Sequence, residues 1–394
     1  MEYHQANQQA FTKRNMNKRQ TIFSTFLVLA GLSLMGIVGS LLLTYQKEAS
    51  LLVLFFFAFL LIGMQGYDRL KGFSFTVWVI AAVAISMTYP SYITEVAGYK
   101  TDGFIVPLIQ LIMFGMGSTM GIKDFLGVIK MPRGVIVGLV SQFTIMPILA
   151  ISLAILMEFP PEIAAGIVLI GSSPSGVSSN IITFLAKGNL ALSITLTSFT
   201  TILAPFLTPL LMKLLAGQFI PIDSYQMMVS IVKMIFVPIV AGMVFNRVFR
   251  GKAGWLHIAM PYLAMAANVV IIAVIVAAGR DSLMEIGLLL LLAAIIHNAS
   301  GYILGYWGCR IFKMNKVDSR TIAIEVGMQN GGMAAGIASE MGKAATLGLF
   351  PAIFGTWMDI SGSFLANWWR TAPTDEKDSA GTRSSPEPLK ETKE

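Results

Sequence analysis

An apolar segment, residues 317–342, is interrupted by the sequence Glu325-Val326-Gly327-Met328-Gln329-Asn330-Gly331-Gly332. The interruption brings a carboxylate, two amides and three glycines into a segment that is otherwise long and apolar enough to cross a bilayer. Non-helical backbone is tolerated at that depth only where it is buried in protein or lines a wet cavity. The stretch therefore predicts a broken helix inside a membrane protein.

A second apolar segment, residues 162–187, contains a comparable interruption. It reads Gly171-Ser172-Ser173-Pro174-Ser175-Gly176-Val177-Ser178-Ser179-Asn180, with five serines around a proline and two glycines. Glycine loosens the helical ladder, and proline removes a backbone donor. A matched pair of interrupted helices in two halves of a chain is the best sequence indication of a transporter's binding site.

Composition agrees with a membrane protein. The chain has 394 residues, of which 55% are hydrophobic and 12% are charged, whereas soluble domains average about 25% charged residues. One cysteine and three histidines exclude a disulfide framework and make a zinc site improbable. The net charge of +7 comes from basic residues in short loops between apolar segments, which is a topology signal. We therefore expect a lipid bilayer around the protein and no nucleic-acid partner.

Twelve segments have the length and apolarity of candidate spanning helices. They cover residues 21–45, 50–66, 73–90, 103–122, 134–157, 162–187, 189–212, 226–249, 258–279, 284–309, 317–342 and 347–369. With the N-terminus in the cytoplasm, 22 of the 28 lysines and arginines fall on the cytoplasmic side and five fall outside. This bias predicts a multi-pass protein of the cell (inner) membrane with both termini in the cytoplasm.

The segments also predict how the chain is divided. We expect a polar cytoplasmic N-terminus (1–20), an extra helical hairpin (21–66), a first five-helix repeat (72–215), a second five-helix repeat (222–370) and a disordered cytoplasmic tail (371–394). Each interrupted segment is the fourth of its five. Because five is odd, the two repeats would have opposite orientations in the membrane, as in many secondary transporters.

Glu325 is the most informative single residue, because a carboxylate inside a span costs roughly 2.5–3.5 kcal/mol on insertion scales. No basic residue is placed to pair with it, so a bound hard cation such as sodium would explain it. The interruptions and their neighbours supply oxygen atoms from Gln142, Ser179, Asn180, Ser193, Thr197, Gln329, Asn330 and the carbonyls near Val326 and Met328. The new helix N-termini would attract an anion. Two simpler interpretations remain: the hydroxyls only bond their own helices, or Glu325 is a protonated structural residue.

At these residues the chain resembles the bile acid:sodium symporter family, including its bacterial pantoate-type members. The most specific matches are the run from Ser179 through Lys187-Gly188-Asn189 to Ser193, and the run from Glu325 to Asn330. The resemblance extends from about Gly72 to Arg370. It implies an all-α fold of ten helices in inverted five-helix repeats, with a core domain, a panel domain and two broken helices that cross in the core.

The resemblance also implies two sodium ions and a nearby substrate site. The first sodium would bind Ser179, Asn180, Ser193, Thr197 and Glu325. The second would bind Gln142, Glu325, Gln329 and the carbonyls of Val326 and Met328. The substrate would contact Val177, Ser178, Asn330, Met358 and Asp359.

Three departures from the family pattern concern the hairpin and the substrate. Residues 1–66 add two spans, Val177 stands where related bacterial members tend to have threonine, and Met358-Asp359 stands where histidine and asparagine are expected.

The function that the resemblance implies is sodium-coupled symport of an organic anion of bile acid, pantoate or keto-acid type. A proton-coupled carrier that uses Glu325 or Asp359 is the main alternative. A membrane enzyme and a structural or receptor protein are weaker ones. The sequence does not indicate the oligomeric state.

Overall fold

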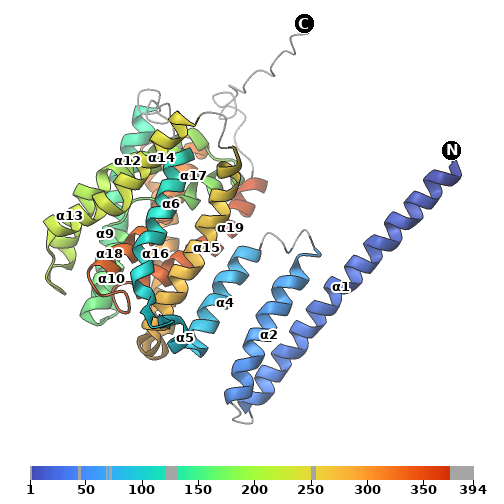
Figure 1. Ribbon diagram of the computed structural model, residues 1–394. Coiled ribbons are helices and arrows are strands. Elements are labelled where there is room, and N and C mark those ends of the chain that lie inside the picture. The colour runs from blue at the N-terminus through green and yellow to red at the C-terminus, as the bar shows by residue number, and fades with distance from the viewer. Residues whose placement is uncertain are drawn as a thin grey trace, which may run out of the picture. The chain divides into compact units, whose positions relative to one another are not determined.

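The computed structural model describes residues 2–42, 46–67, 70, 73–119, 131–249 and 254–372. Figure 1 shows that the described chain is almost entirely helical. It divides into two compact units, one made of Met1–Thr101 with Ile272–Arg280 and the other of Asp102–Ile271 with Asp281–Glu394. Each unit is described by itself below.

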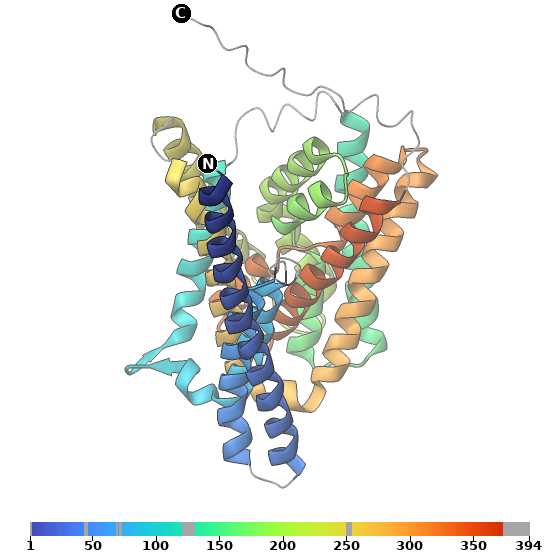
Figure 2. The ribbon, with the colours of Figure 1, turned by 90° about the vertical axis from the view of Figure 1, so that its right-hand side faces the viewer.

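The first unit begins with two long helices that pack side by side. These are α1 (Glu2–Leu42) and α2 (Gln46–Met64), which lie next to each other in both views (Figures 1 and 2). They approach closely because α2 and the turn after it carry glycines: a Cβ added to Gly63 would lie 2.7 Å from the Leu27 side chain. α1 also includes the N-terminal residues 2–20, which the sequence analysis described only as a polar segment.

The rest of the first unit is short. It contains α4 (Ser74–Thr88), α5 (Pro90–Thr94) and a two-stranded antiparallel hairpin of β1 (Glu95–Val96) and β2 (Tyr99–Lys100). The hairpin turn has positive φ angles at Ala97 and Gly98, as a tight two-residue turn requires. The Arg280 Nε donates a hydrogen bond of 2.8 Å to the Met87 carbonyl at the end of α4.

The second unit contains the remaining helices. In chain order they are η1 (Thr101–Phe104, which begins at the boundary), α6 (Ile105–Thr119), α9 (Pro132–Leu156), α10 (Pro161–Gly171), α11 (Ser178–Leu185), α12 (Leu190–Leu211), the π-helical turn η2 (Met212–Ala216), α13 (Ser224–Ile231), the π-helical turn η3 (Val232–Phe236), α14 (Val237–Val248), α15 (Gly254–Ala278, shared with the first unit), α16 (Arg280–Ile311), α17 (Lys316–Gly327), α18 (Gly331–Glu340) and α19 (Leu349–Thr371).

A helix or a pair of helices lies at each of the twelve predicted segments. Six helical stretches among the described residues are long and apolar enough to cross a membrane, namely Gln20–Leu42, Thr101–Ser118, Pro132–Leu156, Leu190–Ala216, Ser224–Val248 and Arg280–Ile311. Four shorter apolar helices accompany them. The all-α polytopic membrane class is therefore confirmed. The number of twelve spans and the repeats over 72–215 and 222–370 stay predictions, and the predicted tail lies outside the described residues from residue 373 onward.

Both predicted interruptions are breaks between helices, and the two breaks cross each other. α10 ends at Gly171 before α11 begins at Ser178, and α17 ends at Gly327 before α18 begins at Gly331. Ser175 and Gln329 form an antiparallel bridge at the crossing. On either side of this bridge, the Gly176 N–H donates to the Met328 carbonyl and the Asn330 N–H donates to the Pro174 carbonyl, both at 2.8 Å. Backbone groups freed by the breaks are thus paired with each other.

The crossing lies in the core of the second unit. Residues 163–171 of α10 and 319–327 of α17 are all buried. The helices packed against them, α9 and α12, are buried on one side and expose large apolar residues such as Val140 and Phe206 on the other. This pattern suits a membrane protein whose polar breaks are enclosed by apolar helices.

Candidate functional site

Glu325 of α17 is the centre of a group of hydroxyls contributed by two helices, α11 and α12. The side chain is 2% exposed. Its Oε1 accepts hydrogen bonds from Ser179 Oγ at 2.6 Å and from Ser193 Oγ at 2.5 Å, and its Oε2 accepts one from Thr197 Oγ1 at 2.9 Å. The buried carboxylate is therefore bonded to neutral donors and forms no ion pair among the described residues.

Local structure explains why these hydroxyls converge. Ser193 and Thr197 are four residues apart on α12 and so lie on the same face of that helix. Ser179 lies in the first turn of α11, directly after the first break. A tight turn joins α11 to α12, and Asn189 caps α12 by accepting a hydrogen bond from the Leu192 N–H.

Asn180 completes the group that the resemblance implied for the first sodium ion. Its Oδ1 lies 2.9 Å from Ser193 Oγ and 3.5 Å from Thr197 Oγ1. All five residues therefore lie together, with six side-chain oxygen atoms in the cluster. Oxygen ligands, including at least one carboxylate, are what a hard cation prefers.

The residues implied for the second sodium ion lie on the other side of the crossing. Gln142 Nε2 on α9 donates to Gln329 Oε1 at 2.7 Å and to the Ser173 carbonyl at 3.0 Å, and Gln329 Nε2 donates to the Val326 carbonyl at 2.6 Å. Gln142 Oε1 is buried without a hydrogen-bond partner. An unpartnered buried oxygen is costly, and a cation would relieve that cost.

Two members of this second set are placed differently from the expectation. The Glu325 carboxylate points into the hydroxyl group described above, while its backbone carbonyl accepts a hydrogen bond from Ser175 Oγ at 3.1 Å. The Met328 carbonyl already accepts the Gly176 N–H across the crossing. Gln142, Gln329 and Val326 are thus brought together, whereas the Glu325 carboxylate lies with the first set.

The residues expected to contact substrate lie at the starts of α11 and α18 and on α19. Val177 and Ser178 are partly buried at the start of α11, which packs against α19, the helix that carries Asp359. Asn330 caps α18 through its Oδ1, which accepts from the Met333 N–H at 2.9 Å, and its Nδ2 is buried without a partner. Met358 is buried on α19.

Comparison with known proteins gives this arrangement a family. The model of the sodium bile acid symporter family matches residues 106–286. An uncharacterized sodium-dependent transporter of Bacillus subtilis is 38% identical over 319 residues, which cover 81% of this chain and 97% of that protein. The chain belongs to the sodium bile acid symporter family. The resemblance stated from the sequence is thereby confirmed.

Two plant relatives are also named as sodium-coupled transporters. A probable chloroplastic sodium/metabolite cotransporter of Arabidopsis thaliana is 31% identical over 306 residues, which cover 77% of this chain and 75% of that protein. A similar protein of rice is 32% identical over 308 residues, 77% of this chain and 74% of that protein. The family and these relatives are transporters, so the prediction that the chain is not an enzyme is confirmed.

Sequence reasoning missed a second polar network in this family member, on the far side of the second break. Asn298 Nδ2 on α16 donates to the Gly327 carbonyl, the last of α17, at 2.9 Å. Ser361 Oγ on α19 donates to Asn298 Oδ1 at 2.6 Å, and the Tyr302 hydroxyl lies 3.4 Å from Ser361 Oγ. The sequence did contain an indication of this network, because Asn298 is a polar residue within the apolar segment 284–309 and such residues are usually functional.

The second half-helices of the two breaks end in the same kind of turn. The Gly188 N–H donates to the Thr183 carbonyl at 2.9 Å after α11, and the Lys343 N–H donates to the Ala338 carbonyl at 2.8 Å after α18. The residue before each donor has a positive φ, 55° at Lys187 and 68° at Gly342. Both turns are Schellman motifs.

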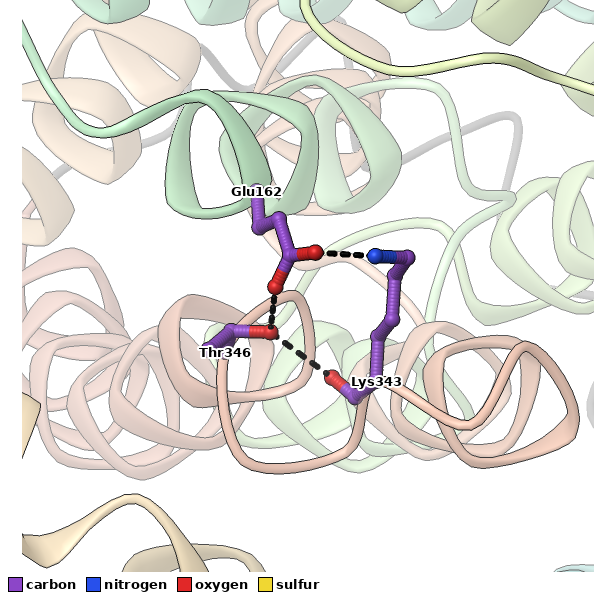
Figure 3. A network of polar contacts seen from close by, with 3 residues as sticks. All are labelled: Glu162, Lys343 and Thr346. Carbon is purple, nitrogen blue, oxygen red and sulfur yellow. Dashed lines mark hydrogen bonds and ion pairs between the residues drawn. The ribbon is translucent and has the colours of Figure 1, made fainter.

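Each of these turns contacts the start of the other broken helix. After α18, Lys343 forms an ion pair with Glu162 at the start of α10, and Thr346 Oγ1 donates to Glu162 Oε2 at 2.5 Å (Figure 3). After α11, Asn189 Nδ2 donates to Asp318 Oδ1 at 2.8 Å at the start of α17. The two broken helices are therefore tied at both ends as well as at the crossing.

A cavity of about 500 Å³ lies beside the first of these contacts, lined by Glu162, Lys343, Thr346, Glu285 and apolar residues from α10 and the segment after η2. It is at the opposite end of α10 from the break. Three of its polar side chains, Glu162, Lys343 and Thr346, are already paired with each other, as Figure 3 shows. We therefore place the candidate site at the crossing and not in this cavity.

Proposed function

We propose that the chain is a sodium-coupled symporter that carries a small organic anion across a lipid bilayer. The observation that carries this proposal is the buried Glu325 carboxylate, which lies among hydroxyl and amide oxygens and forms no described ion pair. The printed names of the Bacillus and plant relatives, which refer to sodium-dependent transport and sodium/metabolite cotransport, support sodium as the coupling ion.

Two sodium ions follow from the two oxygen-rich groups on either side of the crossing. The first would bind Ser179, Asn180, Ser193, Thr197 and the Glu325 carboxylate. Serine and threonine hydroxyls can turn their hydrogens away and present lone pairs to a cation. The second would bind Gln142, Gln329 and the Val326 carbonyl, together with Met328. The unpartnered Gln142 Oε1 supports an ion there.

The anion would bind next to the crossing, where Asn330 and the N-termini of α11 and α18 meet α19. Helix N-termini favour negative charge. Because the same break supplies Gln329 to the ions and Asn330 to the anion, ion binding would order the substrate site. The chemical classes compatible with the family are bile acids, pantoate and keto acids.

Alternating access would follow from inverted repeats over residues 72–215 and 222–370. The equal Schellman turns after α11 and α18, and the contact of each turn with the start of the other broken helix, support such a two-fold relation. The proposed orientation keeps both termini in the cytoplasm of a cell with this protein in its inner membrane.

Sodium itself is the probe that tests the proposal without knowledge of the substrate. A ligand that binds only the folded protein at 100 times its Kd stabilises it by about 2.7 kcal/mol. We expect the Tm of the purified protein to rise when sodium replaces potassium at constant ionic strength. Glu325→Ala should abolish the rise, and Gln329→Ala should weaken it partly.

The second half of the test is transport. Proteoliposomes would be offered labelled pantoate, pyruvate and taurocholate, one compound for each proposed class, with a sodium or a potassium gradient. Uptake of at least one compound with sodium only is expected. Equal Tm values in sodium and potassium, or uptake that follows a pH gradient and ignores sodium, would replace sodium symport with the proton-coupled alternative.

A further inference from the structure

The cavity at the end of α10 that lies away from the break is a candidate for a second binding site. Its volume of about 500 Å³ is typical of small-molecule sites. Four parts of the chain line it: the start of α10, residues 219–221 before α13, the first turns of α16, and the turn after α18. All four lie in the second unit. The cavity is therefore formed by the packing of this unit alone.

Most of the cavity wall is apolar. The large apolar side chains in the lining are those of Ile163, Phe219, Ile220 and Ile286, and three prolines accompany them. A ligand that covers these side chains would remove apolar surface from water, which is favourable. The face of the Phe219 ring also carries partial negative charge and attracts a cation. The wall thus suits a molecule with an apolar body.

Three charged side chains line the cavity, and their charges do not balance. Glu162 forms an ion pair with Lys343 and accepts a hydrogen bond from Thr346 Oγ1, so this contact is neutral overall (Figure 3). Glu285, on α16, is exposed and forms no hydrogen bond or ion pair within the described part of the chain. The lining therefore carries one uncompensated negative charge.

We propose that this cavity binds a small organic cation, in which an ammonium group is attached to an apolar body. The ammonium group would lie near Glu285 and the Phe219 ring, because a carboxylate and an aromatic face both attract it. The apolar body would cover the isoleucines of the wall. An anion is disfavoured here, because Lys343, the basic side chain of the lining, is already paired with Glu162.

This site is separate from the crossing and does not depend on the proposed symport. None of its lining residues belongs to the two proposed ion sites or to the proposed anion site. Glu162 and Lys343, which tie the start of α10 to the turn after α18, both belong to the lining. A bound cation would therefore add contacts around this tie without requiring sodium.

Three probes separate the effect of the charge from that of the apolar body. Benzyltrimethylammonium carries both, tetramethylammonium carries the charge without the ring, and benzyl alcohol carries the ring without the charge. Each probe is titrated into the purified full-length protein by isothermal calorimetry at constant ionic strength. We expect benzyltrimethylammonium to bind about fivefold more tightly than either of the others, which is the scale of cation–aromatic and ionic contacts at exposed sites.

Two variants connect the binding to the cavity. Glu285→Gln removes the uncompensated charge and keeps the shape, so the affinity for benzyltrimethylammonium should fall about fivefold. Ser282→Trp, on the preceding turn of α16, fills the cavity and should abolish binding of this probe. The matched control is Glu340→Gln, because Glu340 is exposed on α18 outside the lining, and glutamine keeps an acceptor for Ser230 Oγ at 3.3 Å. The control should keep the wild-type affinity.

An ammonium group also occurs in lipid headgroups, so a further titration distinguishes the two sources. Benzyltrimethylammonium is titrated into the protein in nanodiscs of phosphatidylglycerol, with and without phosphatidylethanolamine. A lower apparent affinity in the mixed nanodiscs supports a lipid headgroup as the occupant, since the headgroup then competes with the probe. Equal affinities support a soluble amine. Both results keep the ammonium class.

Three outcomes would overturn the inference. Absence of benzyltrimethylammonium binding, or equal affinity for the three probes, would show that the cavity does not select an organic cation. Unchanged affinity in either Glu285→Gln or Ser282→Trp would place the bound probe elsewhere. Loss of probe binding in Glu325→Ala, in protein that is helical by circular dichroism, would move the probe to the crossing. The symport proposal is judged by the sodium response instead, so either proposal can fail without the other.

Discussion

At the scale of the residue, the hydroxyls around Glu325 stabilise its carboxylate without adding a positive charge that would repel a cation. An arginine or lysine beside this carboxylate would neutralise it permanently, and its positive charge would repel an incoming cation. Ser179, Ser193 and Thr197 satisfy the carboxylate through neutral O–H donors. The same groups can accept a cation by rotation about one bond. A carboxylate with these partners is stable in the absence of a cation and can still bind one.

Ser193 offers a direct test of this argument. Ser193→Ala removes the 2.5 Å hydrogen bond to Glu325 and one proposed ion ligand. Hydrogen bonds to charged groups are worth about 1.5–3 kcal/mol, so the sodium concentration for the half-maximal Tm rise should increase by at least about tenfold. The matched control is Ser198→Ala, because Ser198 is equally buried on α12 but donates to the Ile194 carbonyl of its own helix.

The control should shift the sodium midpoint by less than about twofold, since no group of the site loses a partner. Equal sodium midpoints for Ser193→Ala and the wild-type protein would show that Ser193 is not an ion ligand. A fall in Tm without sodium, equal for both variants, would report only the loss of a buried hydroxyl.

These side chains could be predicted from the sequence because a polar side chain inside an apolar spanning segment costs free energy, and so its presence there indicates a function. It could not reach Asn298 and Ser361 in the same way. Their role depends on which carbonyl the break leaves open and which helix lies opposite, and both are properties of the tertiary structure. The direction of the Glu325 carboxylate also follows from its rotamer, which no pattern in the sequence specifies.

At the scale of the element, the two breaks act as one structural unit. Each break frees backbone groups, and the crossing pairs them through Gly176 with Met328 and through Asn330 with Pro174. The positions of both breaks were predictable from glycine, proline and serine in apolar segments. Their mutual pairing was not predictable from those patterns, because it joins residues more than 150 positions apart and depends on how the helices pack.

Gly176 is the position where this unit is most sensitive to substitution. A Cβ at residue 176 would lie 2.6 Å from the Gln329 backbone carbonyl, which cannot move without breaking the bridge. Gly176→Ala should therefore lower the Tm and weaken the sodium response by about tenfold, because a clash with backbone separates the two breaks.

Gly308→Ala on α16 is the control, since nothing lies within 4 Å of an added Cβ there. Alanine in a helix interior is favoured over glycine by roughly 0.5–1 kcal/mol, so this variant should keep or raise the Tm. A Gly176→Ala protein with wild-type Tm and sodium midpoint would show that the crossing tolerates a wider spacing than the structure has.

At the scale of the whole molecule, the predicted property is the orientation of the chain in the membrane. An even number of spanning segments, twelve as predicted, would put both termini on the same side of the membrane, and a helix lies at each of these segments. The distribution of lysines and arginines favours the cytoplasm as that side. Lys187 and Lys213 flank α12 at its two ends, and both are exposed. The proposed orientation puts Lys187 in the cytoplasm and Lys213 outside.

Cysteine labelling measures this orientation. The chain has one cysteine, the buried Cys309, so a Cys309→Ala background leaves no thiol. In intact cells, a membrane-impermeant maleimide should label Lys213→Cys and leave Lys187→Cys unlabelled until the membrane is permeabilised. The reverse pattern would invert the topology, and labelling of both in intact cells would show that α12 does not cross the membrane.

The N-terminal hairpin, residues 21–66, is predicted to be peripheral to the sodium site. The family match begins at residue 106, and the Bacillus relative is matched over 97% of its length by only 81% of this chain, which therefore carries residues that relative lacks. α1 exposes large apolar side chains such as Val28, Leu32 and Met35, which suit contact with lipid. The hydroxyls that hydrogen-bond the Glu325 carboxylate, those of Ser179, Ser193 and Thr197, come from α11 and α12 and not from the hairpin.

Deletion of residues 1–66 should accordingly leave the sodium-dependent Tm rise with a midpoint within about twofold of the full chain. The absolute Tm and the yield should fall, because α2 packs against α4 and its removal exposes an apolar face to a new environment. The measurement is the sodium titration on protein that elutes as a single species from gel filtration. A truncated protein that is monodisperse and helical by circular dichroism but no longer responds to sodium would show that the hairpin shapes the ion site. The predicted peripheral role of residues 21–66 would then be wrong.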